Sequence, residues 1–474
     1  MKKILFLLVL LMTVGTAAAT IKNVKYASFG TPGGGAYYDA GTYTYTWEAS
    51  TGNLMNCFTF ENGELANYKT LKFTFSSLVD GPVRAGYYVG SSFTEFGNGY
   101  YSAGTKTVDL TALGIDLSTV TKIAFGGRSK GGSCVIKWNE MYLENDDDAV
   151  LTALIGSVAG NASYNVPNYG WTSAGSNNLM DVFSGAAGDF SKYAEGVLQF
   201  NITLDDNTNA VRIGYHQGST FTGFGNGFYS SGTKIVDLSS KSSSAAGATT
   251  IKFGAMSAKN SATSGSVVIR PDEMFLVRSE AYNRSFVAGQ KSTVWLPFAL
   301  NAEEVAAAGT FYELTAADGS SLTFTEVATT EAYKPYVFVA KTSGTPFSGM
   351  KSKKIVAPKV CSYTIGDYTF QGTMKDMKAP NGAYGYNSAN GAFAKATSDD
   401  VTIGVFRAYI TASGAAAARE LQCAFGNETT GISEMATRRN GQNENFYDLN
   451  GRKLSGKPMA KGLYIMNGKK YIVK

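Results

Sequence analysis

The chain has 474 residues, 54 of them glycine; aromatic residues make up 13% of it and charged residues only 17%. This length suggests about three domains, and the short β-rich apolar runs favour an extracellular all-β protein over a helical one. Two N-terminal lysines and residues 435–474, which hold nine Lys and Arg against two acidic residues, contribute +9, so the rest of the chain carries −4 of the net charge of +5. The body of the chain therefore has no basic surplus, and nucleic acid is not an expected partner.

The N-terminus has the layout of a cleavable secretory signal, with two lysines, an apolar run at residues 4–12 and three alanines at 17–19. We expect the mature chain to begin near Thr20. No later run approaches the roughly 20 apolar residues that span a bilayer. The sequence thus predicts a secreted or cell-surface protein with no transmembrane segment.

One segment of the chain occurs twice. Residues 83–110 align with residues 211–238 without a gap, and 20 of the 28 positions are identical. The register continues on both sides, and Trp47 and Trp171 precede the matched segments. Each copy has about 110 to 125 residues, a normal size for a β-sandwich.

Alternating apolar and polar residues predict strands at residues 71–75 and 198–202, and closing strands at 135–138 and 267–270. Helical periodicity is nearly absent from both copies. The Gly-Asn-Gly stretch at 97–99 predicts a turn with positive φ. We therefore predict that each copy is an antiparallel sandwich of jelly-roll type.

The four cysteines suggest two disulfides. Cys57 and Cys134 both correspond to valines in the second copy, and this paired replacement suggests that the two positions touch. In an exported chain we then expect a Cys57–Cys134 disulfide, which leaves Cys361 and Cys423 to pair in the third domain. This is one of three connectivities for four cysteines.

After residue 280 the sequence changes character. Runs at residues 293–298, 336–340 and 405–410 predict strands of a separate β domain, and residues 302–308 predict one short helix. The segment resembles β domains that follow binding modules in proteins exported by type IX secretion, which implies a spacer role. We identify no catalytic grouping in it.

Two Asn-Gly pairs, at 450–451 and 467–468, each stand between short apolar-alternating runs. They predict two type I′ hairpins in a small terminal sheet. The stretches DLNGR at 448–452 and KGLYI at 461–465 resemble the C-terminal sorting domain of type IX secretion cargo. The resemblance implies that the secretion machinery is a partner and that the tail is cleaved or anchored. A basic hairpin that only caps the third domain is the alternative.

The repeated modules resemble the galactose-binding-like jelly rolls that serve as carbohydrate-binding modules. The motifs that carry the resemblance are Trp47, RAGY at 84–87, GNGYY at 97–101, VDL at 108–110 and the closing strand with Glu140. It covers residues 24–145 and 150–280 and implies binding of a polysaccharide or other glycan without hydrolysis.

The predicted fold class is all-β, with two tandem jelly-roll β-sandwiches, a third β-sandwich-like domain and a small C-terminal β-hairpin domain. The predicted segments are a signal peptide at 1–19, β-sandwich repeats at 20–148 and 149–283, a third β domain at 284–430, and a linker with the sorting tail at 431–474.

Sugar rings present apolar CH faces that stack on aromatic side chains, and their hydroxyls need planar donors and acceptors such as Asn, Asp and Arg. The repeated loop supplies both kinds of group. The candidate ligand-binding residues are Trp47, Arg84, Tyr88, Asn98, Tyr100 and Tyr101 in the first copy and Trp171, Arg212, His216, Asn226, Phe228 and Tyr229 in the second.

Several of these candidates have a structural alternative. Because side chains alternate along a strand, Tyr100 and Tyr101 face opposite ways, and we expect one inside and one outside. The two tryptophans are favoured as core residues over ligand platforms. For Arg84 and Arg212, an ion pair with a nearby carboxylate is favoured over ligand contact.

The face that carries Arg84 and Arg212 also carries a change from Tyr88 to His216, which suggests tuning of ligand choice. Glu140 and Glu273 end strands where related modules often bind structural calcium. Calcium is the one cofactor considered, and otherwise none is expected.

The chain has a single histidine, His216, with no nucleophile motif near it, and no pair of carboxylates stands out for glycoside hydrolysis. We therefore expect no catalytic residues. The favoured function is non-catalytic glycan binding by a secreted or surface-displayed protein, with two copies for avidity. A cell-surface adhesin or structural protein that binds a protein partner is the alternative, and a glycoside hydrolase is a less favoured one.

Overall fold

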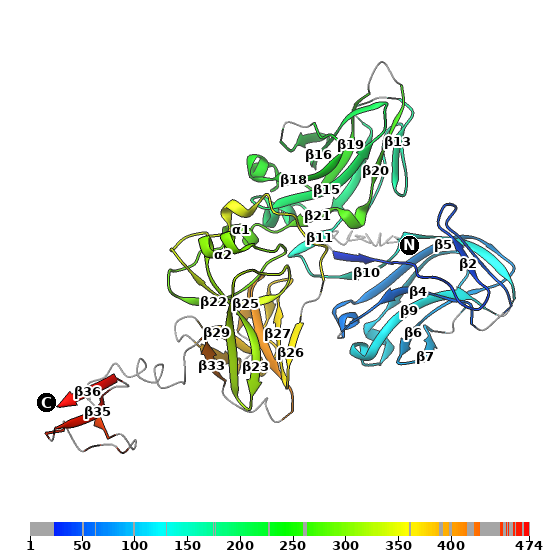
Figure 1. The fold of residues 1–474 in the computed structure, drawn as a ribbon. Coiled ribbons are helices and arrows are strands. Elements are labelled where there is room, and N and C mark those ends of the chain that lie inside the picture. Colours follow the sequence, from blue (N-terminus) through cyan, green and yellow to red (C-terminus); the bar gives the residue numbers. More distant parts are fainter. Residues whose placement is uncertain are drawn as a thin grey trace, which may run out of the picture. The chain divides into compact units, whose positions relative to one another are not determined.

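The strands of the chain form several antiparallel sheets, and its helices are short (Figure 1). The computed structural model describes residues 23–49, 52–61, 63–97, 100–128, 130–173, 175, 177–225, 228–258, 263–359, 362–387, 392–397, 401–414, 421–426, 446–448, 452, 454, 458–459, 461–466 and 469–473. The chain divides into two compact units, Met1–Asn283 with Phe347–Pro358 and Arg284–Pro346 with Lys359–Lys474.

Residues 23–145, called repeat 1 below, form two sheets. The six-stranded sheet has the order β2-β3-β10-β5-β8, with β1 paired to β10, and the four-stranded sheet has the order β4-β9-β6-β7. The strands are β1 (Asn23–Tyr26), β2 (Tyr37–Asp39), β3 (Thr44–Trp47), β4 (Leu54–Thr59), β5 (Thr70–Val79), β6 (Val83–Val89), β7 (Ser92–Glu95), β8 (Gly104–Asp109), β9 (Val120–Gly127) and β10 (Gly132–Asn145).

Residues 150–277, called repeat 2, form the corresponding pair of sheets. The seven-stranded sheet has the order β11-β21-β15-β20-β13-β12, with β18 paired to β15, and the four-stranded sheet has the order β14-β19-β16-β17. The strands are β11 (Val150–Thr152), β12 (Ala162–Asn165), β13 (Asn168–Trp171), β14 (Leu179–Ser184), β15 (Val197–Leu204), β16 (Thr208–Gln217), β17 (Thr220–Gly223), β18 (Gly232–Asp237), β19 (Thr250–Ala258), β20 (Gly265–Ile269) and β21 (Phe275–Val277).

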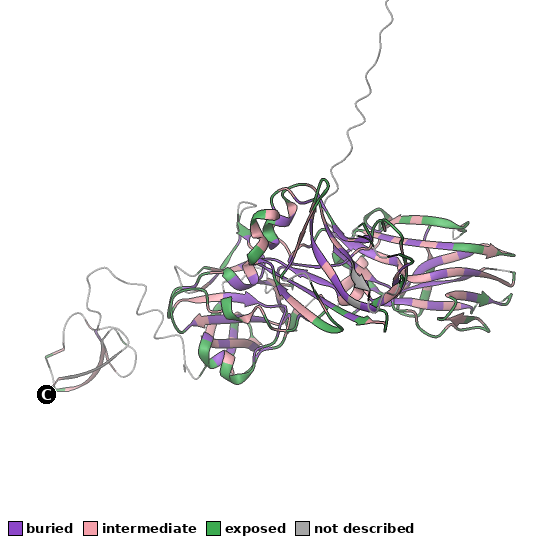
Figure 2. Cartoon of the chain, turned by 90° about the horizontal axis from the view of Figure 1, so that it is seen from above, coloured by how far each residue is buried: buried purple, intermediate pink, exposed green. Residues whose placement is uncertain are grey.

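The two sheets of each repeat pack face to face through aromatic side chains that alternate along the strands. In repeat 1, the rings of Phe73 and Phe75 on β5 lie 6.3 and 5.9 Å from that of Phe125 on β9. In repeat 2, Phe200 on β15 lies 6.4 Å from Phe253 on β19. Figure 2 shows buried residues in bands along the strands and mostly exposed residues in the connections. The predicted all-β fold of sandwich-like domains is confirmed.

The closing strand of each repeat is interrupted at the same place. In repeat 1, β10 bulges away from its pairing with β5 between Ile136 and Met141. In repeat 2, a 3-10 turn at Pro271–Glu273 separates β20 from β21. The side chains in these interruptions leave the regular ladder and are available for contacts outside their own sandwich.

A segment at 347–358, between two strands of the third domain, packs on repeat 2. The side-chain amide of Gln199 donates to the backbone oxygen of Ile355 at 3.0 Å and accepts from its backbone N–H at 2.8 Å. Both residues are buried, and Lys351 adds an ion pair to Asp237 at 2.9 Å. Because one side-chain amide pairs with both the N–H and the carbonyl of Ile355, it holds the segment with the two hydrogen bonds that a neighbouring strand would otherwise provide.

Residues 291–425 form two five-stranded sheets and a two-stranded one, in the orders β22-β25-β23-β24-β33, β26-β27-β32-β29-β30 and β28-β31. The strands are β22 (Lys291–Trp295), β23 (Gly309–Asp318), β24 (Ser321–Val327), β25 (Pro335–Ala340), β26 (Ser362–Ile365), β27 (Tyr368–Gly372), β28 (Met377–Lys378), β29 (Tyr384–Asn387), β30 (Ala392–Lys395), β31 (Thr402–Ile403), β32 (Ala408–Ala412) and β33 (Gln422–Phe425). Among the described residues, the α-helices are α1 (Glu280–Asn283) and α2 (Ala302–Ala308).

Helix α2 has the bounds that the sequence predicts. Asn301 accepts a hydrogen bond from the backbone of Glu304, and the Glu304 side chain accepts one from the backbone of Asn301, which forms a capping box. The strand predicted at 405–410 begins only at Ala408. Phe406 has a φ of 57°, which is incompatible with extended backbone.

The C-terminal sheet consists of β34 (Phe446–Tyr447), β35 (Gly462–Met466) and β36 (Lys469–Val473). The β35–β36 register pairs Met466 with Lys469, which leaves the two-residue connection that the second predicted hairpin requires. At the first predicted hairpin, the backbone N–H of Asp448 donates a hydrogen bond to the Arg452 carbonyl, and that of Leu454 donates one to the Phe446 carbonyl. These hydrogen bonds reverse the direction of the chain. Both Asn-Gly pairs lie outside the described residues.

The predicted signal peptide also lies outside the described residues. In the part of the chain that the structure describes, no helix has the length and apolar character needed to cross a membrane.

The predicted Cys57–Cys134 disulfide is wrong, because both thiols are free. The two cysteines belong to β4 and β10, which lie in opposite sheets of repeat 1, and both contribute to its core. Each thiol is buried in that core and acts as a small apolar side chain. Their joint replacement by valine in repeat 2 therefore reflects a shared core. Cys361 lies outside the described residues, so its pairing with Cys423 stays a prediction.

Burial raises the pKa of the Cys134 thiol to about 12 and raises that of Cys57 further above its usual range. Because the thiolate is the reactive form, we expect both thiols to resist iodoacetamide in the folded protein. After unfolding without reductant, mass spectrometry should find both alkylated. A mass that shows them joined under those conditions contradicts the structure. The double variant Cys57→Val/Cys134→Val, which copies repeat 2, should change the free energy of unfolding by less than about 1.5 kcal/mol.

Candidate functional site

The repeated loop leaves the four-stranded sheet of each repeat and returns to it in the same way. It starts after β7 in repeat 1 and after β17 in repeat 2, where Gly97 and Gly225 have φ values of 58° and 56°. It closes where the backbone N–H groups of Tyr101 and Tyr229 donate, each at 3.0 Å, to the carbonyls of Val83 on β6 and Val211 on β16. The predicted positive-φ turn is confirmed at both glycines.

The second aromatic residue of each loop packs inward. The Tyr101 hydroxyl donates to the Phe96 carbonyl at 3.1 Å, and its ring meets the Phe73 ring edge-on at 5.2 Å. Tyr229 makes the same contacts in repeat 2, with the Phe224 carbonyl at 3.0 Å and the Phe200 ring at 5.3 Å. Burial raises the pKa of both hydroxyls.

The first aromatic residue of each loop points outward. Tyr100 is 52% exposed and Phe228 is 53% exposed. Of each adjacent pair, then, the first residue faces solvent and the second supports the loop. Asn98 and Asn226, the polar candidates of these loops, lie outside the described residues.

In repeat 1 the exposed ring stands at the end of a row of charged side chains. The guanidinium of Arg128 lies 4.3 Å from the centroid of the Tyr100 ring and forms an ion pair with Glu95. Glu95 is also 3.6 Å from Arg84, whose guanidinium donates to Asn53 at 3.3 Å. The expected ion pair of Arg84 is thus present, and it belongs to a network that reaches the loop.

Repeat 2 does not reproduce this row. Gly223 corresponds to Glu95, and Met256 corresponds to Arg128. Arg212 lies over the Phe221 ring at 4.9 Å, and burial lowers its pKa. The two repeats therefore share an exposed aromatic residue but surround it with different chemistry.

The change from Tyr88 to His216 lies away from the loop. His216 is four residues beyond Arg212 on β16, which places it about 13 Å further along the strand. Its neighbours are Lys252 and Asp181, which form an ion pair at 2.6 Å. In repeat 1, Tyr88 packs on Phe93 instead.

Trp47 and Trp171 are core residues, with 2% and 3% of their surface exposed. The Trp47 indole donates to the Lys130 carbonyl at 2.6 Å and stacks on Tyr45. A Cβ atom on Gly127 would lie 2.1 Å from this indole, so the glycine makes room for it. Neither tryptophan can serve as a ligand platform.

The two carboxylates considered for calcium pair with cationic side chains. Glu140 is 3.7 Å from Lys137, and Glu273 is 3.6 Å from Arg270 and accepts from Asn201 at 2.9 Å. Among the described residues, no group of three or more His, Cys, Asp or Glu side chains is arranged to hold a metal ion. Calcium binding at these two residues stays a prediction.

Two residues of the row, Glu95 and Arg128, are absent from the sequence-based candidates. A signal for Glu95 exists, because it is one of the few positions that differ in a segment otherwise shared by both copies. Arg128 follows the matched strand and gives no such signal.

No protein-family model matches the chain, and no curated protein matches it. The glycoside hydrolase domain of Spr0440, Endo-D from Streptococcus pneumoniae R6, has 10% identity and a TM-score of 0.17, covering 44% of this chain and 31% of that one. A candidate secreted protein from Parabacteroides distasonis ATCC 8503 has 7% identity and a TM-score of 0.15, covering 55% and 89%. The chain thus spans about a third of the first of these structures. Similarity this low supports no functional argument.

Opposite orientation of the two loop tyrosines predicts unequal effects of their replacement on stability. Tyr101→Ala removes a ring that packs on Phe73 and should lower the free energy of unfolding by about 2 kcal/mol. Tyr100→Ala removes an exposed ring and should change it by no more than about 0.5 kcal/mol. Calorimetry of the full chain measures both, and equal shifts of the repeat 1 transition contradict the assignment.

His216 should titrate below its usual pKa, because burial and then Lys252 disfavour its charged form while Asp181 opposes this. Since it is the only histidine, one imidazole NMR signal reports it. Lys252→Met should raise the midpoint, and Lys234→Met in the other sheet should not. The unfolded chain therefore binds this proton at a higher pH than the folded chain does. His216 leaves the free energy of unfolding unchanged above its usual pKa and lowers it as the pH falls below that value. A midpoint above 6.5, the usual value, contradicts the prediction.

Proposed function

We propose that this chain is a non-catalytic glycan-binding protein, secreted or displayed at the cell surface, in which each repeat binds through its exposed loop ring. The observation that carries the proposal is the equal exposure of Tyr100 and Phe228 at matching positions. Half-exposed rings in both copies suit contact with an apolar ligand face, and the CH faces of sugars provide such a surface.

The surroundings of Tyr100 supply the polar half of such a site. Arg128 supports the ring, and Glu95 and Arg84 follow it as planar charged groups that are less exposed than Arg128. Groups of this kind pair with neighbouring hydroxyls of a sugar. Repeat 2 has Gly223 and Met256 in place of Glu95 and Arg128, so we propose that the two repeats differ in preference or affinity.

Non-catalytic binding is favoured over hydrolysis by the chemistry of this row. Glycoside hydrolysis uses two carboxylates on opposite sides of the scissile bond. Glu95 is the one carboxylate of the row and is held by two guanidinium groups. Tandem binding modules also gain avidity, because the second contact forms at high effective concentration. Export through the N-terminal signal and the sorting tail is part of the same proposal.

Affinity gel electrophoresis of the full chain in xyloglucan, galactomannan, starch and mucin tests the proposal. Tyr100→Ala and Phe228→Ala should each weaken binding to one polysaccharide by about fivefold to tenfold through loss of stacking. The double variant should abolish retardation, because avidity is lost as well.

Tyr37→Ala is the matched control, since Tyr37 is an exposed aromatic residue on β2, outside the loop. It should migrate like the unmodified protein. Retardation of the double variant equal to that of the unmodified protein contradicts binding by the loops. A folded protein that no polysaccharide retards favours the adhesin that contacts protein instead.

A further inference from the structure

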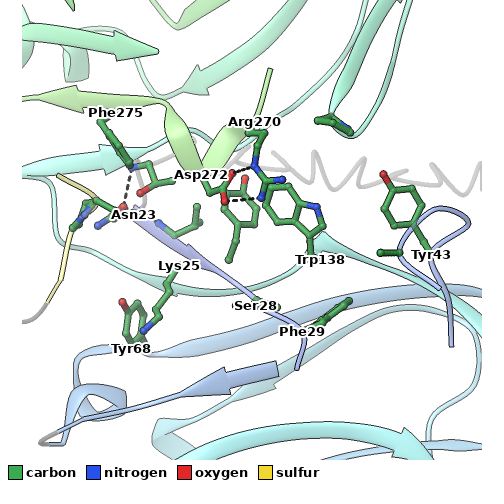
Figure 3. A pocket seen from close by; sticks show the side chains of 18 of the residues that line it. Asn23, Lys25, Ser28, Phe29, Tyr43, Tyr68, Trp138, Arg270, Asp272 and Phe275 are labelled. Atoms are coloured by element: carbon green, nitrogen blue, oxygen red, sulfur yellow. Dashed lines mark hydrogen bonds and ion pairs between the residues drawn. The ribbon is translucent and has the colours of Figure 1, made fainter. Parts of the chain in front are cut away.

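A cavity of about 570 Å³ lies where repeat 1 and repeat 2 meet within the first compact unit (Figure 3). Its walls come from both repeats and from Ala357 and Pro358 of the segment that packs on repeat 2. A cavity of this size falls in the range of small-molecule sites. It is separate from the repeated loops, whose exposed rings do not line it.

Hydrogen bonds between the first strands of the two repeats hold the cavity together. The Tyr26 hydroxyl on β1 donates to the Ala153 carbonyl at 2.7 Å, and Asn23 accepts from the Thr152 backbone on β11 at 3.0 Å. Next to them, the Tyr43 hydroxyl donates to the Val166 carbonyl. Tyr26, Asn23 and Thr152 are all buried, so this part of the wall is formed before any ligand arrives.

Aromatic rings form much of the lining. Trp138, from the bulge of β10, meets Tyr26 edge-on at 5.5 Å, and Phe29 meets Tyr38 edge-on at 5.1 Å. In Figure 3, Trp138 and Arg270 lie side by side, and the guanidinium is 4.5 Å from the ring centroid. The bulge thus turns a residue of the closing strand into a wall of the cavity.

The cations of the lining are already paired. Lys25 contacts Glu64 at 2.5 Å, and Arg270 binds both oxygens of Asp272 at 3.2 and 3.0 Å. An anionic ligand would have to compete with these carboxylates. A neutral ligand with hydroxyl groups can instead share their remaining donor and acceptor positions, next to the exposed Ser28.

The cavity occurs once in each chain, although the modules are repeated. Trp138 corresponds to Pro271 in repeat 2, and Tyr43 corresponds to Pro167. Residues that differ between the copies therefore contribute to this joint.

From these contacts we propose that the cavity binds a short neutral oligosaccharide, as a third site distinct from the two loops. The inference rests on the proposed function in naming a glycan as ligand. Its aromatic rings can contact the CH faces of a sugar. Its charged side chains, already paired with one another, can form hydrogen bonds with the sugar hydroxyls.

Tryptophan fluorescence reports this site selectively. Of the four tryptophans, Trp47, Trp171 and Trp295 are at most 3% exposed, whereas Trp138 is partly exposed. Acrylamide quenching of the full chain should therefore come mainly from Trp138, and Trp138→Phe should remove most of it while keeping an aromatic wall.

The probes are cellobiose, maltose, lactose and mannobiose. At least one should roughly halve the quenching constant, since a bound ligand in such a pocket shields its walls. Ser28→Tyr, which fills the cavity from an exposed position, should abolish the protection, and Ser28→Ala should retain it. Equal melting temperatures establish that both variants are folded.

The loop double variant Tyr100→Ala/Phe228→Ala separates the inference from the proposed function. Protection of Trp138 that persists in this variant supports a separate site. If polysaccharides retard the unmodified protein but no disaccharide protects Trp138, the loops bind glycan and the cavity does not. Protection that survives in Ser28→Tyr also overturns the inference. Protection without retardation supports the cavity and contradicts the loop sites.

Discussion

The packing of one sheet on another through alternating aromatic side chains is the constraint on which the rest of each repeat depends. Because neighbouring residues of a strand face opposite ways, filling the space between the sheets decides at the same time what faces solvent. Tyr101 fills a place against Phe73, and its neighbour Tyr100 is turned outward as a consequence. The exposed ring of each loop is thus a product of core packing.

The two copies keep this constraint and vary what lies outside it. The inward tyrosine has the same two contacts in both repeats, one to a ring and one to a carbonyl. Outside the core, Glu95 is replaced by Gly223 and Trp138 by Pro271. A substitution on an outer face or in a bulge leaves the packing between sheets intact, so surface chemistry can diverge while the sandwich is retained. Duplication gave this chain two modules that fold alike and present different surfaces.

The interruption of the closing strand in each repeat places side chains where they contact the other repeat. A regular strand would place Trp138 on one face of its own sheet. The bulge between Ile136 and Met141 releases it from that ladder, and Arg270, from the matching interruption in repeat 2, lies against it. The contact between the repeats is thus made by side chains that lie outside the regular strand pairing of either sheet.

The sequence alone determined what depends on short-range pattern: the duplication, the all-β class, helix α2 with its capping box, the turn at Gly97 and the hairpin between β35 and β36. These features follow from residues a few positions apart, which carry the periodicity and turn chemistry. Only the tertiary structure decided that Tyr100 rather than Tyr101 faces solvent, and that Cys57 and Cys134 share a core without a bond. It also brought Glu95 to Arg128 and Trp138 to Arg270. Such distances join strands that are remote in the chain, and they are set by how sheets and repeats pack, which no local pattern encodes.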